Sequence, residues 1–238
     1  MEHLSLNGHN MIIITGASKG IGKYLFDKFS EQGKEVIGTF NSTNVAGSSS
    51  NSMYKVDITD YKQITDFFLK IKDRLNDIVL INSAGASYNS FAHKANLEAW
   101  KKIIDINLTG TFNMIHHVLQ IMREQNYGRI INFSSVVAQT GVPGTSAYAA
   151  SKAGLWGMTK AIAVENGSKG ITINTLNLGY FNTGMINEIP LEIKEVLKAK
   201  IPIGNQFGDP ENIFDAINFI IKTSYLTGAS IDINGGII

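Results

Sequence analysis

Short apolar runs alternate along this chain with longer stretches whose apolar residues recur at helical spacing. Residues 11–14 (MIII) are apolar at every position, which is typical of a parallel strand buried on both faces. A glycine-rich turn and a helix-like stretch over 23–29 follow them. The pattern predicts seven strands, at about 11–15, 35–40, 53–56, 77–82, 128–134, 171–177 and 229–233. It predicts helices near 20–32, 60–75, 97–124, 146–166 and 210–222.

This alternation indicates the α/β class, with one doubly wound Rossmann domain in which helices cover both faces of a seven-stranded parallel sheet. The length of 238 residues suits a single domain over 1–238, since neither a repeat nor a second-domain boundary interrupts it. Residues 41–52, rich in Ser, Asn and Gly, predict a flexible loop in place of a helix between the second and third strands.

Composition narrows the function classes. Hydrophobic residues make up 44% and charged residues 17%, and the formal net charge of +1 gives no reason to expect nucleic acid or a membrane surface as a partner. The absence of cysteine excludes disulfides, thiolate metal sites and cysteine nucleophiles, and the five histidines show no metal-ligand spacing. No apolar run approaches the roughly 18 residues of a membrane span. Residues 1–10 lack signal-peptide features, so we expect a cytoplasmic protein. From the absence of cysteine and the spacing of the histidines, we expect no metal site.

Residues 15–22 (TGASKGIG) place three glycines between the first predicted strand and the first predicted helix. Gly16 permits a tight turn, Gly20 lets the backbone approach a pyrophosphate, and Gly22 allows close packing of the helix. The helix N-terminus then presents backbone N–H groups to phosphates. This context favours dinucleotide binding over the alternative, a purely structural turn.

Tyr148 and Lys152 lie four positions apart in a predicted helix, so they project from one face a turn from each other. A phenol has a reference pKa of about 10, and a fixed ammonium beside it favours the phenolate. Such a pair also arises by accident on solvated helices. Ser135 upstream and the glycine turn favour the functional interpretation.

With these residues in hand, the chain resembles the short-chain dehydrogenases/reductases, most closely their 3-oxoacyl-acyl-carrier-protein reductase branch. The resemblance extends from Met11 to about Ile237. The motifs that carry it are the turn over 15–22, Asn82-Ser83-Ala84-Gly85, Asn107 within 106–110, Ser135 within 128–135, Tyr148 with Lys152, and Asn234-Gly235-Gly236.

The resemblance implies reduction of a carbonyl by hydride transfer from a nicotinamide. Ser135 would hydrogen-bond the carbonyl oxygen, and Tyr148 would protonate it as general acid. Lys152 would hold the nicotinamide ribose hydroxyls and lower the pKa of Tyr148. Asn107 would anchor a water that relays protons to Lys152. Ser134 competes for the serine role, but the family's catalytic serine lies thirteen residues before the tyrosine, which selects Ser135.

Cofactor choice is made at the end of the second strand, where residues 36–42 contain no acid to bind a ribose 2′-hydroxyl. This absence permits a 2′-phosphate, and Lys19 matches a basic residue of NADP-using relatives, so we favour NADPH over NADH. An exposed loop lysine is the alternative. Asp57 resembles the family's adenine-contacting acid, although it competes with Thr59 or Asp60 to cap the next helix.

The cofactor-binding residues implied by the resemblance are Gly16, Ser18, Lys19, Gly20, Ile21, Gly22, Asn41, Ser42, Asp57, Ile58, Asn82, Ala84, Gly85, Tyr148, Lys152, Gly179 and Thr183. Small residues over 82–85 would let the backbone approach the nucleotide, and Thr183 would contact the nicotinamide carboxamide. The alternative for this segment is a structural turn in which Asn82 ties adjacent strands.

The chain departs from the family pattern in several places. Leu178 stands where Pro is usual before Gly179, and the loop 204–210 lacks a common Arg. Of two basic positions that relatives use to dock acyl carrier protein, Lys169 keeps its charge and Asn126 does not. The departures leave the acyl substrate open.

We therefore expect an NADPH-dependent ketoreductase that acts on a small carbonyl substrate. A 3-oxoacyl thioester, or an acyl chain bound to a carrier, is one candidate for this substrate. A reductase or dehydrogenase of a sugar, polyol or other small carbonyl is the alternative enzyme, and a non-catalytic dinucleotide-binding regulatory protein the alternative of another class. Residues 180–205 follow the sixth strand and would form the substrate lid, or a small helical pair packed on the domain, and both can hold. The resemblance also implies a homotetramer built through the two long helices and the C-terminal strand.

Overall fold

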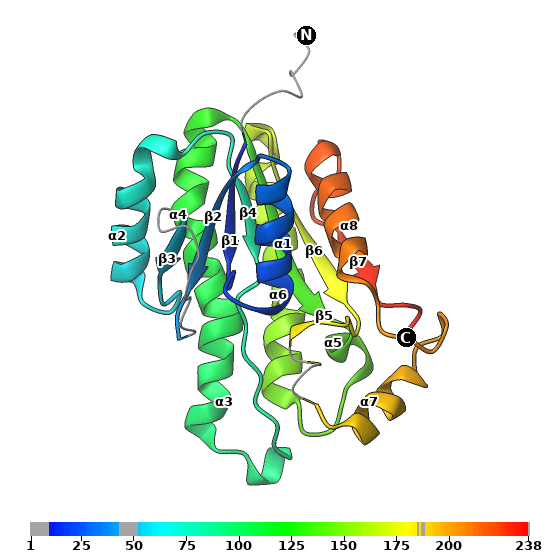
Figure 1. The fold of residues 1–238 in the computed structure, drawn as a ribbon. Coiled ribbons are helices and arrows are strands. Elements are labelled where there is room, and N and C mark those ends of the chain that lie inside the picture. Colours follow the sequence, from blue (N-terminus) through cyan, green and yellow to red (C-terminus); the bar gives the residue numbers. More distant parts are fainter. Residues whose placement is uncertain (1–9, 43–51, 185, 187–188, 238) are drawn as a thin grey trace.

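The computed structural model describes residues 10–42, 52–184, 186 and 189–237 (Figure 1). Seven strands form one sheet in the order β3-β2-β1-β4-β5-β6-β7, and every neighbouring pair is parallel. The strands are β1 (Met11–Thr15), β2 (Glu35–Phe40), β3 (Met53–Lys55), β4 (Val79–Asn82), β5 (Gly128–Ser135), β6 (Ile171–Leu178) and β7 (Ser230–Ile233). The predicted fold class and all seven strands are confirmed. Most of the predicted loop over 41–52 lies outside the described residues.

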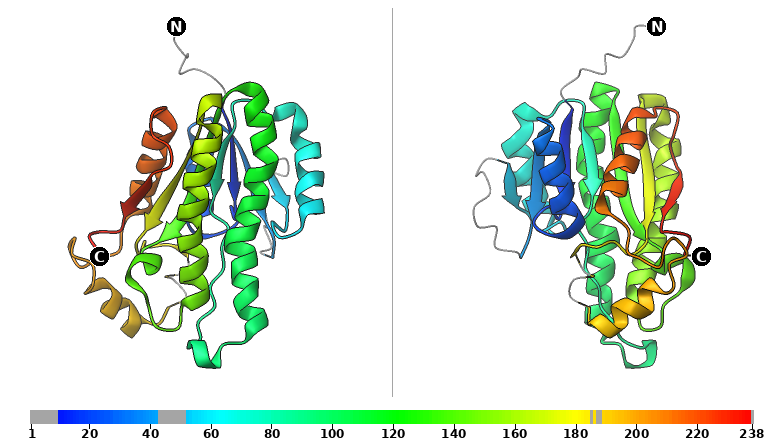
Figure 2. Two further views of the ribbon diagram at one scale, coloured as in Figure 1. Left: turned by 180° about the vertical axis from the view of Figure 1, so that it is seen from behind. Right: turned by 45° about the vertical axis from the view of Figure 1, so that its right-hand side comes forward.

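Helices pack on both faces of this sheet, as Figures 1 and 2 show. They are α1 (Gly20–Glu31), α2 (Tyr61–Ile71), α3 (Leu97–Ile104), α4 (Gly110–Gln125), α5 (Val137–Thr140), α6 (Ser146–Asn166), α7 (Leu191–Lys198) and α8 (Pro210–Lys222). Helices α1 and α8 cover one face, and α2, α4 and α6 cover the other. Within the described part of the chain, no helix is long and apolar enough to cross a bilayer.

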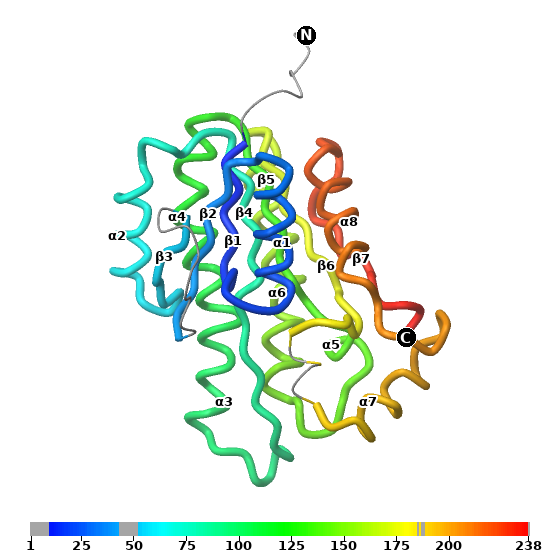
Figure 3. Tube along the Cα trace, viewed as in Figure 1, coloured from blue at the N-terminus to red at the C-terminus, as the bar shows by residue number. Residues whose placement is uncertain are grey.

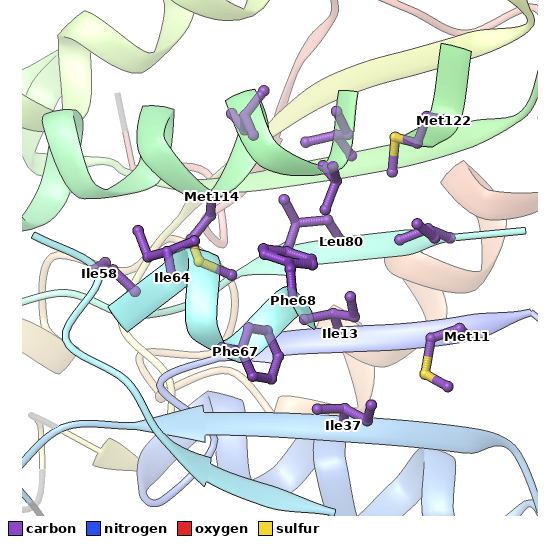
Figure 4. Packing of buried hydrophobic residues seen from close by; sticks show 14 of the residues in the cluster. Met11, Ile13, Ile37, Ile58, Ile64, Phe67, Phe68, Leu80, Met114 and Met122 are labelled. Carbon is purple, nitrogen blue, oxygen red and sulfur yellow. The ribbon is translucent and has the colours of Figure 1, made fainter. Parts of the chain in front are cut away.

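The unbroken apolar runs of the strands are explained by this double cover. Side chains alternate between the faces of a strand, so Ile13 packs with α2, α4 and α6 while Ile12 and Ile14 pack with α1 and α8. Figure 4 shows the first of these cores, in which Phe67 and Phe68 of α2 meet the strand residues. Burial on both faces leaves the loops at the strand ends as the exposed, adaptable part of the molecule.

The predicted helix over 97–124 is interrupted. Its path is continuous in Figure 3, but a π-helical turn, Asp105–Thr109, separates α3 from α4. Such turns insert one extra residue into the helix and are frequent at functional sites. The turn contains Asn107, whose side chain is fully buried. The segment 180–205, for which the sequence offered a lid or a small helical pair, contains one regular α-helix, α7, among its described residues.

Candidate active site

The carboxyl ends of β1 and β4 mark the point where the strand order reverses, and ligands of open α/β sheets bind in the crevice at such a point. Thr15 and Asn82 are register partners there. The Thr15 hydroxyl accepts hydrogen bonds from the N–H groups of Ser83 (3.1 Å) and Ala84 (3.0 Å). The glycine turn after β1 and the loop after β4 are therefore fixed against each other.

The glycine turn is packed so closely that side chains are excluded. Gly16 has a φ of +69°, and a Cβ there would lie 2.7 Å from the Cα of Ala84. A Cβ on Gly22 would overlap the Gly16 carbonyl group. A Cβ on Gly20 would lie 3.0 Å from the Cα of Gly184, so the chain that follows Thr183 meets this turn. Because α1 begins at Gly20, its free N–H groups open beside the turn, which fits the pyrophosphate of a dinucleotide.

At the end of β5, Ser135 meets the first turns of α6, which carry Tyr148 and Lys152. Ser135 Oγ accepts from the N–H of Val137 at 3.2 Å, and its hydroxyl lies close enough to the Tyr148 phenol to lower the pKa of that phenol. The Lys152 ammonium lies 5.7 Å from the centre of the Tyr148 ring and donates to the carbonyl oxygen of Phe133 at 2.7 Å. Burial lowers the pKa of Lys152 to about 8. The hydroxyl groups of Ser135 and Tyr148 and the buried ammonium of Lys152 thus lie close together at the carboxyl end of the sheet.

The expectation that Lys152 lowers the pKa of Tyr148 is wrong for this structure. Burial raises the pKa of Tyr148 and outweighs the lowering effect of the neighbouring Ser135 hydroxyl, and the phenol of Tyr180 raises it further. The Lys152 ammonium does not contribute to this pKa shift of Tyr148, because it donates its hydrogen bond to the Phe133 carbonyl and not to the Tyr148 oxygen. Tyr148 is therefore held as the neutral phenol, the form that can donate a proton.

The side chain of Asn107 is used for holding the backbone. Its Oδ1 accepts from the N–H of Ala86 at 2.8 Å, and its Nδ2 donates to the Ala86 carbonyl (2.9 Å) and to Ser151 Oγ (3.0 Å). The main-chain carbonyl of Asn107 accepts from Thr111 Oγ1 at 2.9 Å. The amide of Asn107 therefore ties the loop after β4 to α6.

The choice of Ser135 over Ser134 agrees with the geometry. Ser134 Oγ donates to the main-chain carbonyl of Lys152 at 2.9 Å and is buried there. The sequence alternative that Asn82 ties neighbouring strands also agrees, because its Nδ2 donates to Asn132 Oδ1 at 2.9 Å. The same segment still approaches the site, since a Cβ on Gly85 would lie 3.6 Å from Lys152 Nζ.

At the outer end of the sheet edge, the Asp57 carboxylate accepts from Thr59 N (2.9 Å), Thr59 Oγ1 (2.7 Å) and Asn41 Nδ2 (3.0 Å). Burial raises the pKa of Asp57, but these hydrogen bonds outweigh it and the pKa falls below its usual value. Asp60, and not Asp57, caps α2, because its side chain accepts from the N–H groups of Lys62 and Gln63. Asp57 is thereby left at the edge of the site.

A hollow of about 380 Å³ opens beside Asp57, away from Ser135 and Tyr148. Its lining residues are Asn41, Asp57, Thr59, Lys102, Asp105, Ile106 and Thr109. The sequence motifs did not include Lys102 and Asp105, and they included Ile106 and Thr109 only as neighbours of Asn107. Their only signal was position, since they precede and follow Asn107 on the same helix.

Lys19 and Asn41 are exposed on neighbouring strand-end loops. Ala17, two residues before Lys19, donates its N–H to the carbonyl of Thr39 at 2.8 Å, and Asn41 lies two residues after Thr39. Ser18 lies in the glycine turn and Ile21 in the first turn of α1, while Ser42 follows β2 and Ile58 follows β3. Gly179, after β6, is packed against Asn234, since a Cβ there would lie 2.7 Å from the Asn234 Cα. Among the described residues, no group of three His, Cys, Asp or Glu side chains could hold a metal ion.

Comparison with known proteins identifies the class. Residues 10–194 match the family model described as short chain dehydrogenase. The chain belongs to this family and is an oxidoreductase that acts on carbonyl and hydroxyl groups. Family membership implies a nicotinamide dinucleotide cofactor, which fits a turn whose three glycine positions leave no room for a side chain.

Individual relatives match along nearly the whole chain. An acetoacetyl-CoA reductase of Shinella zoogloeoides is 35% identical over 233 residues, covering 94% of this chain and 96% of the relative. The 3-oxoacyl-[acyl-carrier-protein] reductase FabG of Thermotoga maritima is 35% identical over 238 residues, covering 95% and 96%. FabG of Escherichia coli is 32% identical over 233 residues, covering 94% and 95%.

Proposed function

We propose that this protein is an NADPH-dependent ketoreductase that reduces 3-oxoacyl thioesters. The observation that carries the proposal is that Ser135, Tyr148 and Lys152 come together at the carboxyl end of the sheet, where Lys152 is buried with its ammonium 5.7 Å from the centre of the Tyr148 ring. Relatives named as acetoacetyl-CoA and 3-oxoacyl-carrier reductases support the substrate class. The substrates in these names carry the ketone on coenzyme A or on acyl carrier protein. We propose that the substrate of this protein is also bound to coenzyme A or to a carrier protein.

The chemistry follows from the groups of this chain. Ser135 hydrogen-bonds the ketone oxygen and orients it, and Tyr148 gives its phenolic proton to that oxygen as negative charge develops there. The raised pKa of Tyr148 keeps this proton in place at neutral pH. When bound, the nicotinamide supplies the hydride. Lys152, which donates to the Phe133 carbonyl in this structure, would hold the ribose hydroxyls of the nucleotide, and a water held by Asn107 would relay a proton to it.

The preference for NADPH rests on charge at the end of β2. The described part of this region, residues 36–42, contains no acid, and Lys19 lies on the loop bonded to it through Ala17 and Thr39. An ammonium there can pair with a 2′-phosphate as a point charge. The remaining cofactor residues named from the sequence are proposed to line the nucleotide from the glycine turn to Thr183.

We further propose that residues 1–238 act as one catalytic domain with 180–205 as its substrate lid. Gly184 meets Gly20, which ties the start of this segment to the nucleotide turn. Helix α7 exposes Leu191, Ile193 and Val196, apolar side chains that suit an acyl chain. Residues 185, 187 and 188 of the segment lie outside the described residues.

An alternative substrate class is a sugar, polyol or other small carbonyl. It is favoured by Asn126, which replaces a basic docking residue of relatives and adopts a left-handed conformation (φ 54°) as the C-cap of α4. A residue fixed in this way serves the helix end and is not a charged docking point.

The test is turnover by the purified protein. NADPH oxidation is followed with acetoacetyl-CoA and an acetoacetyl thioester of N-acetylcysteamine beside a panel of ketones, sugars and polyols. We expect the thioesters to be preferred and Tyr148→Phe to lose turnover by about 10²–10⁴-fold while retaining NADPH binding by fluorescence. Turnover of sugars without any thioester would support the alternative, and an active Tyr148→Phe variant would refute the acid assignment.

A further inference from the structure

Ser151 lies between the two functional residues of α6, three positions after Tyr148 and one before Lys152. Its side chain is fully buried, with 0% exposed. Its Oγ donates to the main-chain carbonyl of Tyr148 at 2.7 Å and accepts from Asn107 Nδ2 at 3.0 Å. The Ser151 hydroxyl therefore both donates and accepts a hydrogen bond inside the protein.

The hydrogen bonds continue beyond Asn107 to a second element of the site. The amide of Asn107 pairs with both the N–H and the carbonyl of Ala86, in the loop that follows β4. The π-helical turn Asp105–Thr109 brings Asn107 between this loop and α6. A Cβ on Gly85 would lie 3.3 Å from Asn107 Oδ1 and 3.6 Å from Lys152 Nζ, so the connection passes directly beside the reacting groups.

We propose that Ser151 is a positioning residue that fixes Tyr148 and Lys152 relative to the loop after β4. The proposal rests on the proposed ketoreductase function. Ala86, Asn107, Ser151 and the Tyr148 backbone form one directional chain of hydrogen bonds, and each buried group in it has a partner. Without the Ser151 hydroxyl, one N–H of Asn107 is left buried and unpaired, and the first turns of α6 lose their tie to the nucleotide loop.

Removal of the Ser151 hydroxyl should slow the chemical step, the transfer of the hydride. A misplacement of about 1 Å can cost up to about 10²-fold in rate without loss of binding. For Ser151→Ala we expect kcat to fall by about 10- to 100-fold, with the KM for NADPH within about twofold of the parent, because Ser151 touches neither nucleotide nor substrate. We also expect the deuterium isotope effect on kcat, measured with NADPH deuterated at the transferred position, to rise as hydride transfer becomes more fully rate-limiting.

The matched control is Ser146→Ala, at the start of the same helix. Ser146 Oγ accepts from Trp100 Nε1 at 3.1 Å and so also ties α6 to α3, but away from Asn107. We expect it to change kcat and the isotope effect little. Ser151→Cys, whose thiol is a weak donor and acceptor, decides the question where the alanine variant does not fold. Its kcat should then be lowered at unchanged KM.

A lower melting temperature of the Ser151 variants with kcat and isotope effect unchanged would overturn the proposal, because a merely structural role predicts that result. Failure of the proposed function is recognised separately, in the parent protein. If the parent prefers another carbonyl, the same comparison is made with that substrate. If the parent turns over no carbonyl at all, both proposals fall.

Discussion

At the residue scale, the phenol of Tyr180 is one of the groups that keep Tyr148 protonated. Burial is the largest cause of the raised pKa of Tyr148, and the neighbouring phenol adds to it. Tyr180→Phe removes that contribution, so the pKa of Tyr148 should fall. Because reduction needs the protonated phenol, the alkaline decline of kcat/KM should then move to lower pH. Rate profiles against pH for both proteins check this, and an unmoved or upward-shifted decline contradicts it.

Lys152 gives a stability prediction with a defined sign. Burial lowers its pKa from 10.5 to about 8, so between these values the unfolded chain binds a proton that the folded chain has released. Stability therefore rises with pH across this window, relative to a protein without the ammonium. Melting temperatures of the parent and Lys152→Met should diverge in favour of the parent from about pH 8 to 10.5. Parallel curves through the window would show that burial does not shift this lysine.

Lys19 should separate the two cofactors. Its ammonium is proposed to pair with the 2′-phosphate, a group that NADH lacks. For Lys19→Ala we expect the dissociation constant of NADPH to increase by about tenfold, the equivalent of 1.4 kcal/mol, and that of NADH to change little. Fluorescence titration of both nucleotides measures this. Equal weakening of the two would remove support for the assignment. Lys23→Ala, one turn further along α1, is the control.

At the element scale, the sequence was most informative where packing is two-sided. Strands such as β1 and β4 are apolar at each position before their last residue, so their bounds were predictable within one or two residues. The π-helical turn was not, because the residues on each side of 105–109 keep helical spacing among themselves and so predicted one helix over 97–124. The role of Asn107 in binding Ala86 and Ser151 was hidden for the same reason.

The strand-to-helix connection at the glycine turn gives the next prediction. Gly22 cannot accept a side chain, since a Cβ would overlap the Gly16 carbonyl and lie 2.9 Å from its carbon, and backbone has little room to yield. Gly22→Ala should weaken dinucleotide binding and lower the melting temperature. Gly167→Ala, in open space with helical φ −57°, should instead stabilise by about 0.4–1 kcal/mol. Thermal unfolding and nucleotide titration of both variants test the pair; a neutral Gly22→Ala would contradict the packing argument.

At the scale of the whole molecule, parallel topology explains why distant motifs could be assigned together. The carboxyl ends of β1, β4, β5 and β6 meet at one edge, so residues from 15 to 179 come together there. The motifs did not show which neighbouring groups determine the pKa values at the carboxyl end of the sheet. Whether burial or a neighbouring ammonium decides the pKa of Tyr148 depends on where the Lys152 side chain points, and its hydrogen bond to Phe133 follows only from three-dimensional packing.

The proposed homotetramer concerns surfaces that the fold leaves apolar. Val164 on α6 is 88% exposed, and Phe112 on α4 and Phe219 on α8 are also exposed, on the long helices and beside β7. Val164→Glu adds a charge at a position with no internal packing to lose, so the fold should persist while assembly through α6 weakens. Burial of a carboxylate against a partner copy would be unfavourable unless it is paired. Light scattering after gel filtration should give a tetramer for the parent and a smaller species for the variant, with matching circular dichroism. Lys70→Glu, at an exposed position of α2 and so outside the two long helices, is the control for added charge. A monomeric parent would contradict the assembly, and a tetrameric Val164→Glu variant would exclude this face of α6 from the interface.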